Sequence, residues 1–198
     1  ERPCVMATAG QDFAEYRSWL ESEGIDTTYI EEIPDEFTAS FFVSTDRANN
    51  QIASFYTGAM SCAHQLSFRT LACHPIEMAV IAPNDPRAMI KYVQECQELG
   101  IPYMYDPSQQ IVRLEGEDLL AGARGADILI SNDYEFGMLG RKTGLSGQEI
   151  LGLARVTIIT DGERGSTIVP RGEAPVSIPA VAPRRLADPT GVGVAYRA

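Results

Sequence analysis

The chain has 198 residues, 44% of them hydrophobic, and a formal net charge of −11, so it is long enough to bury one sizeable core. The negative charge repels a phosphate backbone, and no stripe of Lys and Arg with interleaved aromatic residues offsets it, so we predict no nucleic-acid partner. No apolar run approaches the roughly 18 residues of a membrane span, and four cysteines without a CxxC pair favour a reducing, cytoplasmic location away from membranes.

The first 59 residues predict a strand, a helix and a small sheet. Residues 4–7 form an apolar run short enough for a buried strand, and residues 11–20 carry apolar side chains at helical spacing before Gly24, which is a typical helix end. Three β-rich segments follow without a helix between them, at residues 28–30, 37–43 and 51–56. Strands joined in this way pair antiparallel, so we expect a three-stranded meander beside the main body.

The rest of the chain alternates between strands and helices. Asp85 and Pro86 are typical of a helix start, and Gly100 of a helix end. Strands are predicted at 78–82, 103–105, 128–130 and 156–159, helices near 86–99, 119–120, 134–139 and 150–153, and a final β stretch at 166–169 and 176–178. Repeated βα units of this length predict a doubly wound, mostly parallel sheet with helices on both faces.

The glycine-rich segment near the end of the chain carries the clearest chemical signal. It contains Asp188, Gly191, Val192, Gly193 and Val194. The two glycines permit a tight turn, and the first N–H groups of a following helix would point at an anion such as a phosphoryl group. Because Gly-x-Gly also occurs in ordinary turns, the residues alone leave a plain turn as an equally good interpretation.

This segment resembles the C-terminal signature of the ribokinase (PfkB) kinases, which reads Asp-x-x-Gly-x-Gly-Asp and leads into a helix. Asp188, Gly191 and Gly193 match the signature. The resemblance implies that the backbone from Gly191 through Val192 to Gly193 binds the transferring phosphoryl group and that Asp188 belongs to the ATP site. It also places the family's catalytic base, an aspartate, at Val194, where this chain has a valine.

Two further stretches resemble the family in the same order. Asn132 and Glu135 match its Asn-x-x-Glu motif, which implies that they hold Mg²⁺ through water; the alternative is that Glu135 only stabilises a helix N-terminus. Thr160, Gly162 and Gly165 match a Thr-x-Gly-x-x-Gly stretch that lies along the ATP, and the alternative there is a hairpin turn. Both motifs follow predicted strands.

An earlier segment adds to the resemblance. Asp106 and Pro107 follow a predicted strand, and the form that continues through Ser108 to two glutamines is similar to the adenosine kinase-like branch of the family. Residues 27–59 occupy the place of the family's β-sheet lid over the acceptor, between residues 1–26, which begin the α/β domain, and residues 60–198, which continue it. The family's N-terminal strand and its closing helices have no counterpart in the 198 residues, so we expect a partial chain.

The resemblance implies ATP-dependent phosphoryl transfer to a hydroxyl of an adenosine-like nucleoside or a sugar. ATP and Mg²⁺ are the implied cofactors, with a monovalent cation as a further candidate. Val194 favours an alternative, a catalytically impaired module that binds the nucleotide or sugar. The resemblance leaves both a monomer and a homodimer open.

Overall fold

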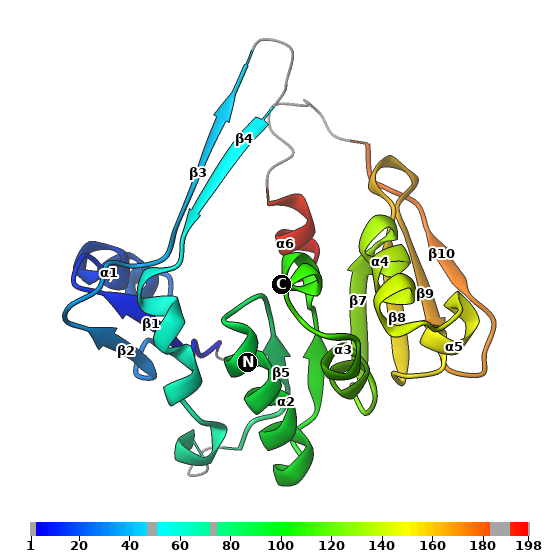
Figure 1. The fold of residues 1–198 in the computed structure, drawn as a ribbon, viewed down its shortest axis with the longest axis horizontal. Coiled ribbons are helices and arrows are strands. Elements are labelled where there is room, and N and C mark those ends of the chain that lie inside the picture. The colour runs from blue at the N-terminus through cyan, green and yellow to red at the C-terminus, as the bar shows by residue number, and fades with distance from the viewer. Residues whose placement is uncertain (1–2, 47–50, 72–74, 183–190, 198) are drawn as a thin grey trace. The chain divides into compact units, whose positions relative to one another are not determined.

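The computed structural model describes residues 3–46, 51–71, 75–182 and 191–197. It separates into two compact units, Glu1–Thr70 and Leu71–Ala198 (Figure 1). The first unit has two small two-stranded sheets and the second has one six-stranded sheet, and each unit has its own buried side chains.

The first unit begins with a parallel β-α-β element. Strand β1 (Ala7–Gly10) and strand β2 (Ile30–Ile33) pair in parallel, with helix α1 (Ala14–Ser22) between them in the chain. Phe13 and Leu20 are 5% and 8% exposed and form a core with Ala9 and Ile30. Apolar residues from the helix and from both strands therefore hold this element together.

Two predictions for the first unit need correction. The strand predicted at residues 4–7 begins only at Ala7, and upstream of it Cys4 forms a single parallel bridge to Asp26. The three-stranded antiparallel meander is wrong, because the first of its segments became β2 and pairs in parallel with β1. Helix α1 supplies the crossover that parallel pairing requires, and the side chains of β2 complete the core beside it.

The remaining two segments form an antiparallel ribbon of strands β3 (Ser40–Thr45) and β4 (Gln51–Tyr56). Its base is fixed where the N–H of Ala59 donates to the carbonyl of Phe37 at 2.9 Å. Gly58 has a φ of +46°, and a Cβ there would lie 2.1 Å from that same carbonyl oxygen. Only glycine fits at this position. Two 3-10 helices, η1 (Gly58–Gln65) and η2 (Phe68–Leu71), follow.

The second unit contains a six-stranded sheet in the order β10-β9-β8-β7-β6-β5. Strands β5 (Ala79–Ile81), β6 (Tyr103–Tyr105), β7 (Ile128–Asn132) and β8 (Val156–Thr160) are parallel. Strands β9 (Ser166–Pro170) and β10 (Val176–Ile178) add an antiparallel edge. The fold class predicted from the sequence, a mostly parallel sheet with helices plus a small antiparallel sheet, is confirmed.

The sequence predicted helices on both faces of this sheet, but the described helices that connect the parallel strands share one face. Each step from β5 to β8 moves in the same direction along the sheet, so right-handed crossovers place their helices on the same side. They appear in front of the strands in Figure 1. These connections contain α2 (Pro86–Leu99), the 3-10 helix η3 (Ser108–Val112), α3 (Gly116–Ala123), α4 (Asp133–Thr143) and α5 (Gly147–Leu151).

Helix α2 shows how local sequence fixes these elements. The Asp85 side chain caps its start by accepting the N–H of Arg87 at 3.0 Å, and Pro86 occupies the first turn. Gly100 ends the helix with a φ of +67°. Both ends lie where the sequence predicted them. Within the residues described, neither this helix nor any other has the length and apolar character needed to cross a membrane.

Candidate active site

Polar residues gather at the carboxyl ends of the parallel strands in the second unit. Asn132 ends β7 and Thr160 ends β8, and the two residues are direct partners in the parallel register. Asp106 follows the end of β6, and its N–H donates to the carbonyl of Ile81 at 3.0 Å. Open α/β sheets bind ligands at this edge, which makes it the candidate site.

Asn132 and Glu135 form a reciprocal cap on helix α4. The Asn132 side chain accepts the N–H of Glu135 at 2.8 Å, and Glu135 Oε2 accepts the N–H of Asn132 at 2.9 Å. Glu135 Oε1 also accepts a hydrogen bond from the Ser108 hydroxyl at 3.2 Å. The pair therefore satisfies two N–H groups at the helix start, so Glu135 does stabilise that helix end.

The capped carboxylate can still take part in binding a hydrated Mg²⁺. Each Glu135 oxygen accepts one hydrogen bond from the protein, and a carboxylate offers about four lone-pair sites. Among the described residues, no group of three or more His, Cys, Asp or Glu side chains is placed to hold a metal ion. Mg²⁺ commonly keeps several waters and uses one or two carboxylates plus phosphate oxygens. Asn132 and Glu135 fit that arrangement through water.

The segment with Thr160, Gly162 and Gly165 is a hairpin turn between β8 and β9. The N–H of Asp161 donates to the carbonyl of Gly165 at 2.8 Å, around a single 3-10 turn, η4 (Gly162–Arg164). A Cβ at Gly165 would lie 2.0 Å from the carbonyl oxygen of Ile178, so close packing alone requires this glycine. A hydrogen bond from Arg164 lowers the pKa of the Asp161 carboxyl. The turn lies directly after Thr160, at the candidate edge.

The glycine signature forms a turn and a short helix. Gly191 has a φ of +82°, and helix α6 (Val192–Arg197) begins at the next residue. A Cβ on Gly193 would meet no atom within 4 Å among the described residues. Val194 lies in the first turn of α6, and its side chain is 56% exposed. Asp188 lies outside the described residues.

Two polar contacts attach α6 to the carboxyl edge of the sheet. The Arg197 guanidinium forms an ion pair with the carboxylate of Asp106. The Tyr196 hydroxyl lies 2.7 Å from the Ser166 hydroxyl, and Ser166 is the partner of Thr160 in the β8–β9 register. The end of the glycine signature therefore lies beside the ends of β6 and β8.

These anchoring residues were not singled out from the sequence. Arg197 follows Gly193 by four residues, which places the two on one face of a helix. Asp106 and Ser108 were noted only as part of a motif. An arginine one turn after the glycines and an aspartate at a strand end were the available signals, but only the fold brings residues 91 positions apart into contact.

Burial dominates the electrostatics of Asp106. Removal from water raises the pKa of its carboxyl, although a hydrogen bond and the charge of Arg197 act in the opposite direction. The charge of the nearby Glu135 carboxylate also raises the pKa of Asp106. The candidate edge thus has two carboxylates, of which Asp106 is paired with the largely covered Arg197 guanidinium and Glu135 accepts hydrogen bonds from Ser108 and Asn132.

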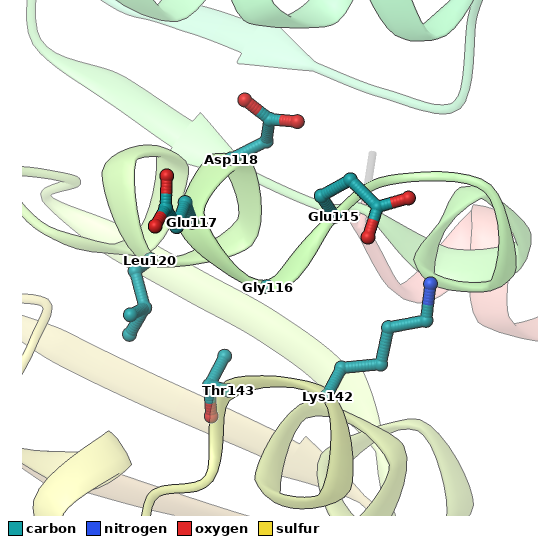
Figure 2. Close-up of a pocket in the computed structure, with 7 residues that line it drawn as sticks. All are labelled: Glu115, Gly116, Glu117, Asp118, Leu120, Lys142 and Thr143. Atoms are coloured by element: carbon teal, nitrogen blue, oxygen red, sulfur yellow. The ribbon is translucent and has the colours of Figure 1, made fainter.

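A separate hollow of about 560 Å³ lies between the start of α3 and the end of α4 (Figure 2). Its wall is acidic, and its one lysine, Lys142, donates to the carbonyls of Val112 and Leu114 at 2.9 and 2.7 Å. None of the site residues predicted from the sequence lines it; the lining consists of Glu115, Gly116, Glu117, Asp118, Leu120, Lys142 and Thr143. The hollow therefore shares no lining residue with the predicted site.

Comparison with known proteins identifies the family. The sequence profile of the pfkB family carbohydrate kinases matches residues 4–198. The chain belongs to the PfkB family. A nucleoside kinase from Methanothermobacter thermautotrophicus is 32% identical over 203 aligned positions, which cover 100% of this chain and 64% of that protein. The chain therefore spans less than two thirds of the length of this PfkB relative.

Solved structures of PfkB relatives agree with the fold. A Burkholderia thailandensis nucleoside kinase in complex with inosine superposes with a TM-score of 0.91 at 34% identity, covering 97% of this chain and 64% of that one. The same kinase in complex with ADP-inosine gives a TM-score of 0.89 at 34% identity, covering 97% and 60%. The predicted membership of the ribokinase (PfkB) family is confirmed.

Proposed function

We propose that this protein transfers the γ-phosphoryl group of ATP to a hydroxyl of a nucleoside. Membership of the PfkB family and the similarity to nucleoside kinases support this function. The observation that carries it is the attachment of the glycine-turn helix α6 to Asp106 and Ser166, at the same strand ends that present Asn132 and Thr160. Convergence of these segments at a carboxyl edge is the arrangement expected of a ligand site.

Each segment has a proposed role in that reaction. The backbone N–H groups from Gly191 to Gly193 would bind the transferring phosphoryl group, and the turn after Thr160 would lie along the ATP. Asn132 and Glu135 would hold Mg²⁺ through water, and the ion would neutralise charge on the phosphates when bound. Positioning and charge stabilisation account for most catalysis in phosphoryl transfer, so backbone groups can carry much of the rate.

Val194 favours a second candidate function. A valine side chain cannot accept a proton from the acceptor hydroxyl, and its exposure of 56% leaves it in contact with solvent. General-base catalysis typically contributes about 10²–10⁴-fold to a rate. A protein that keeps the binding segments without the base would serve as a nucleotide-binding or nucleoside-binding module. The V194D assay described below separates this function from kinase activity.

We propose a purine nucleoside as the acceptor, in preference to a free sugar. The Burkholderia relative was solved with inosine bound. The lid predicted over residues 27–59 would consist of the β3–β4 ribbon, which exposes Phe41 and Phe55 by 58% and 51%. Aromatic side chains of this kind can stack on a base.

The test replaces Val194 by aspartate in the full-length protein and measures ADP release with inosine, adenosine or ribose at saturating Mg-ATP. We expect the V194D variant to turn over about 10²–10⁴-fold faster than the parent, since the new carboxylate can accept the acceptor proton. Calorimetry should show Mg-ATP affinities of the two proteins within a few-fold of each other.

A Val194→Asn variant is the matched control, because asparagine has nearly the shape of aspartate without its basicity. It should stay at the parent rate. Equal turnover of the V194D and parent proteins on every acceptor would exclude position 194 as the base. Binding of ATP and nucleoside without turnover in either protein would favour the binding module.

The metal ions, the oligomeric state and the cellular location predicted from the sequence can each be tested separately. Mg²⁺ dependence is tested by titrating the metal in the same assay, and a monovalent cation by exchanging K⁺ for a bulky organic cation. The choice between monomer and homodimer is tested by sedimentation, and the cytoplasmic location by fractionation of the source cells.

A further inference from the structure

Helix α6 is too short to hold its position without outside contacts. It has six residues, none of them buried, and Val192 and Val194 are 63% and 56% exposed. Isolated helices shorter than about 12–15 residues are marginal in water. Because apolar packing within the described residues contributes little here, polar contacts must decide where the glycine turn lies.

The stronger of these contacts is the ion pair between Arg197 and Asp106, which is largely shielded from solvent. The side chains of Arg197 and Asp106 are 16% and 12% exposed. Removing one partner from a desolvated pair leaves the other charge buried without compensation, which costs far more than breaking a surface salt bridge. Asp106 cannot shift easily, because its own N–H is bonded to Ile81 in the adjoining strand.

The pair is also connected to the cap of helix α4. Ser108 follows Asp106 by two residues, and its hydroxyl donates to Glu135 at 3.2 Å. Ser108 has a φ of +39°, a conformation that non-glycine residues rarely adopt. The segment Asp106–Ser108 therefore contacts α6 at one end and the Asn132–Glu135 cap at the other.

The spacing along α6 lets this ion pair control the position of the glycine turn. Arg197 is four residues after Gly193, so fixing its guanidinium fixes the rotation and height of the first helical turn. We propose that Asp106 and Arg197 are positioning residues that hold the phosphoryl-binding glycine turn of α6 at the carboxyl edge of the sheet. This inference rests on the proposed kinase function, and neither residue needs to touch the substrate.

The test uses the full-length V194D protein as the parent, with Arg197→Met and Arg197→Lys variants. The methionine variant should lower kcat by up to about 10²-fold, because misplacement by about 1 Å costs rates of this order. KM for ATP should change less than kcat. The lysine variant keeps the charge and should recover part of the lost rate. Hydrogen exchange of residues 192–197 should rise in the methionine variant alone.

The control is a more exposed ion pair of the same sheet, Asp127–Arg155, which joins β7 and β8 at the opposite, amino-terminal edge at 3.0 Å. The Arg155→Met variant should leave kcat, KM and the exchange of residues 192–197 unchanged. Urea unfolding of every variant separates a loss of positioning from a loss of fold.

The outcomes distinguish this inference from the function on which it rests. A parent that neither binds Mg-ATP nor turns over would overturn the proposed function, and the positioning role with it. A parent that is active, together with a methionine variant of equal kcat, would overturn the positioning role alone. Equal losses of kcat in the Arg197 and Arg155 variants would show a general effect on stability and would also overturn it.

Discussion

The β3–β4 ribbon and the β7–β8 pair contain similar residues but lie in opposite environments. Both are rich in β-branched and other apolar side chains. Phe42 and Ile52 in the ribbon are 64% and 77% exposed, whereas Leu129 in β7 and Thr157 in β8 are fully buried. The ribbon has two strands only, while β7 and β8 have strands on both sides and helices over one face. Burial therefore depends on what covers a strand, and composition alone does not predict it.

The largest expected difference between the two regions is in backbone protection. We expect amides of β3 and β4 to exchange on the order of 10³-fold faster than those of β7 and β8, because sparsely covered segments open at low free-energy cost. Hydrogen exchange followed by mass spectrometry measures both regions in one sample. Equal protection of peptides covering Phe41 and Ile158 would show that the ribbon is held as firmly as the sheet.

A pair of truncations provides the next test. Leu129→Ala should lower the free energy of unfolding by about 2–5 kcal/mol, since it leaves a cavity in the core. Phe42→Ala should change it by about 0.5 kcal/mol or less, as is usual for exposed positions. Urea unfolding monitored by circular dichroism gives both values. A loss of stability in the Phe42 variant as large as in the Leu129 variant would mean that the ribbon's side chains are covered in solution.

The smallest expected effect concerns a helix end beside the sheet. Ser146 and Glu149 cap helix α5, and hydrogen bonds from the Ser146 hydroxyl and N–H lower the pKa of Glu149 from its ordinary value of 4.5. A lowered carboxyl pKa stabilises the fold above pH 4.5, and this contribution is lost as the pH falls through the lowered value. Ser146→Ala should therefore lower the urea midpoint at pH 7.

Below the lowered pKa the deficit of the Ser146→Ala variant should shrink, because the protonated Glu149 no longer accepts both hydrogen bonds. Midpoints measured between pH 7 and pH 3 test this dependence. A deficit that is constant over that range would assign the effect to the loss of the hydroxyl cap on the Glu149 N–H alone.

Local signals in the sequence predicted much of the second unit. The Asp85–Pro86 start and the Gly100 end of α2 act within one or two turns of the chain, so they do not depend on distant residues. The first unit was harder to predict, because the sequence does not show whether β2 pairs with β1 or with β3. Its pairing with β1 was decided by the shared core of Phe13, Leu20 and Ile30, which joins residues far apart in the sequence.

The candidate site divides in the same way. The sequence by itself determined the family, the order of the motifs and the valine at position 194, because these depend on residue identity at short spacing. Tertiary structure alone decided that Arg197 meets Asp106, that Tyr196 meets Ser166, and that Glu135 faces the Ser108 hydroxyl. Such contacts form only when parallel strands align their carboxyl ends, because the alignment brings loops from separate βα units to one edge.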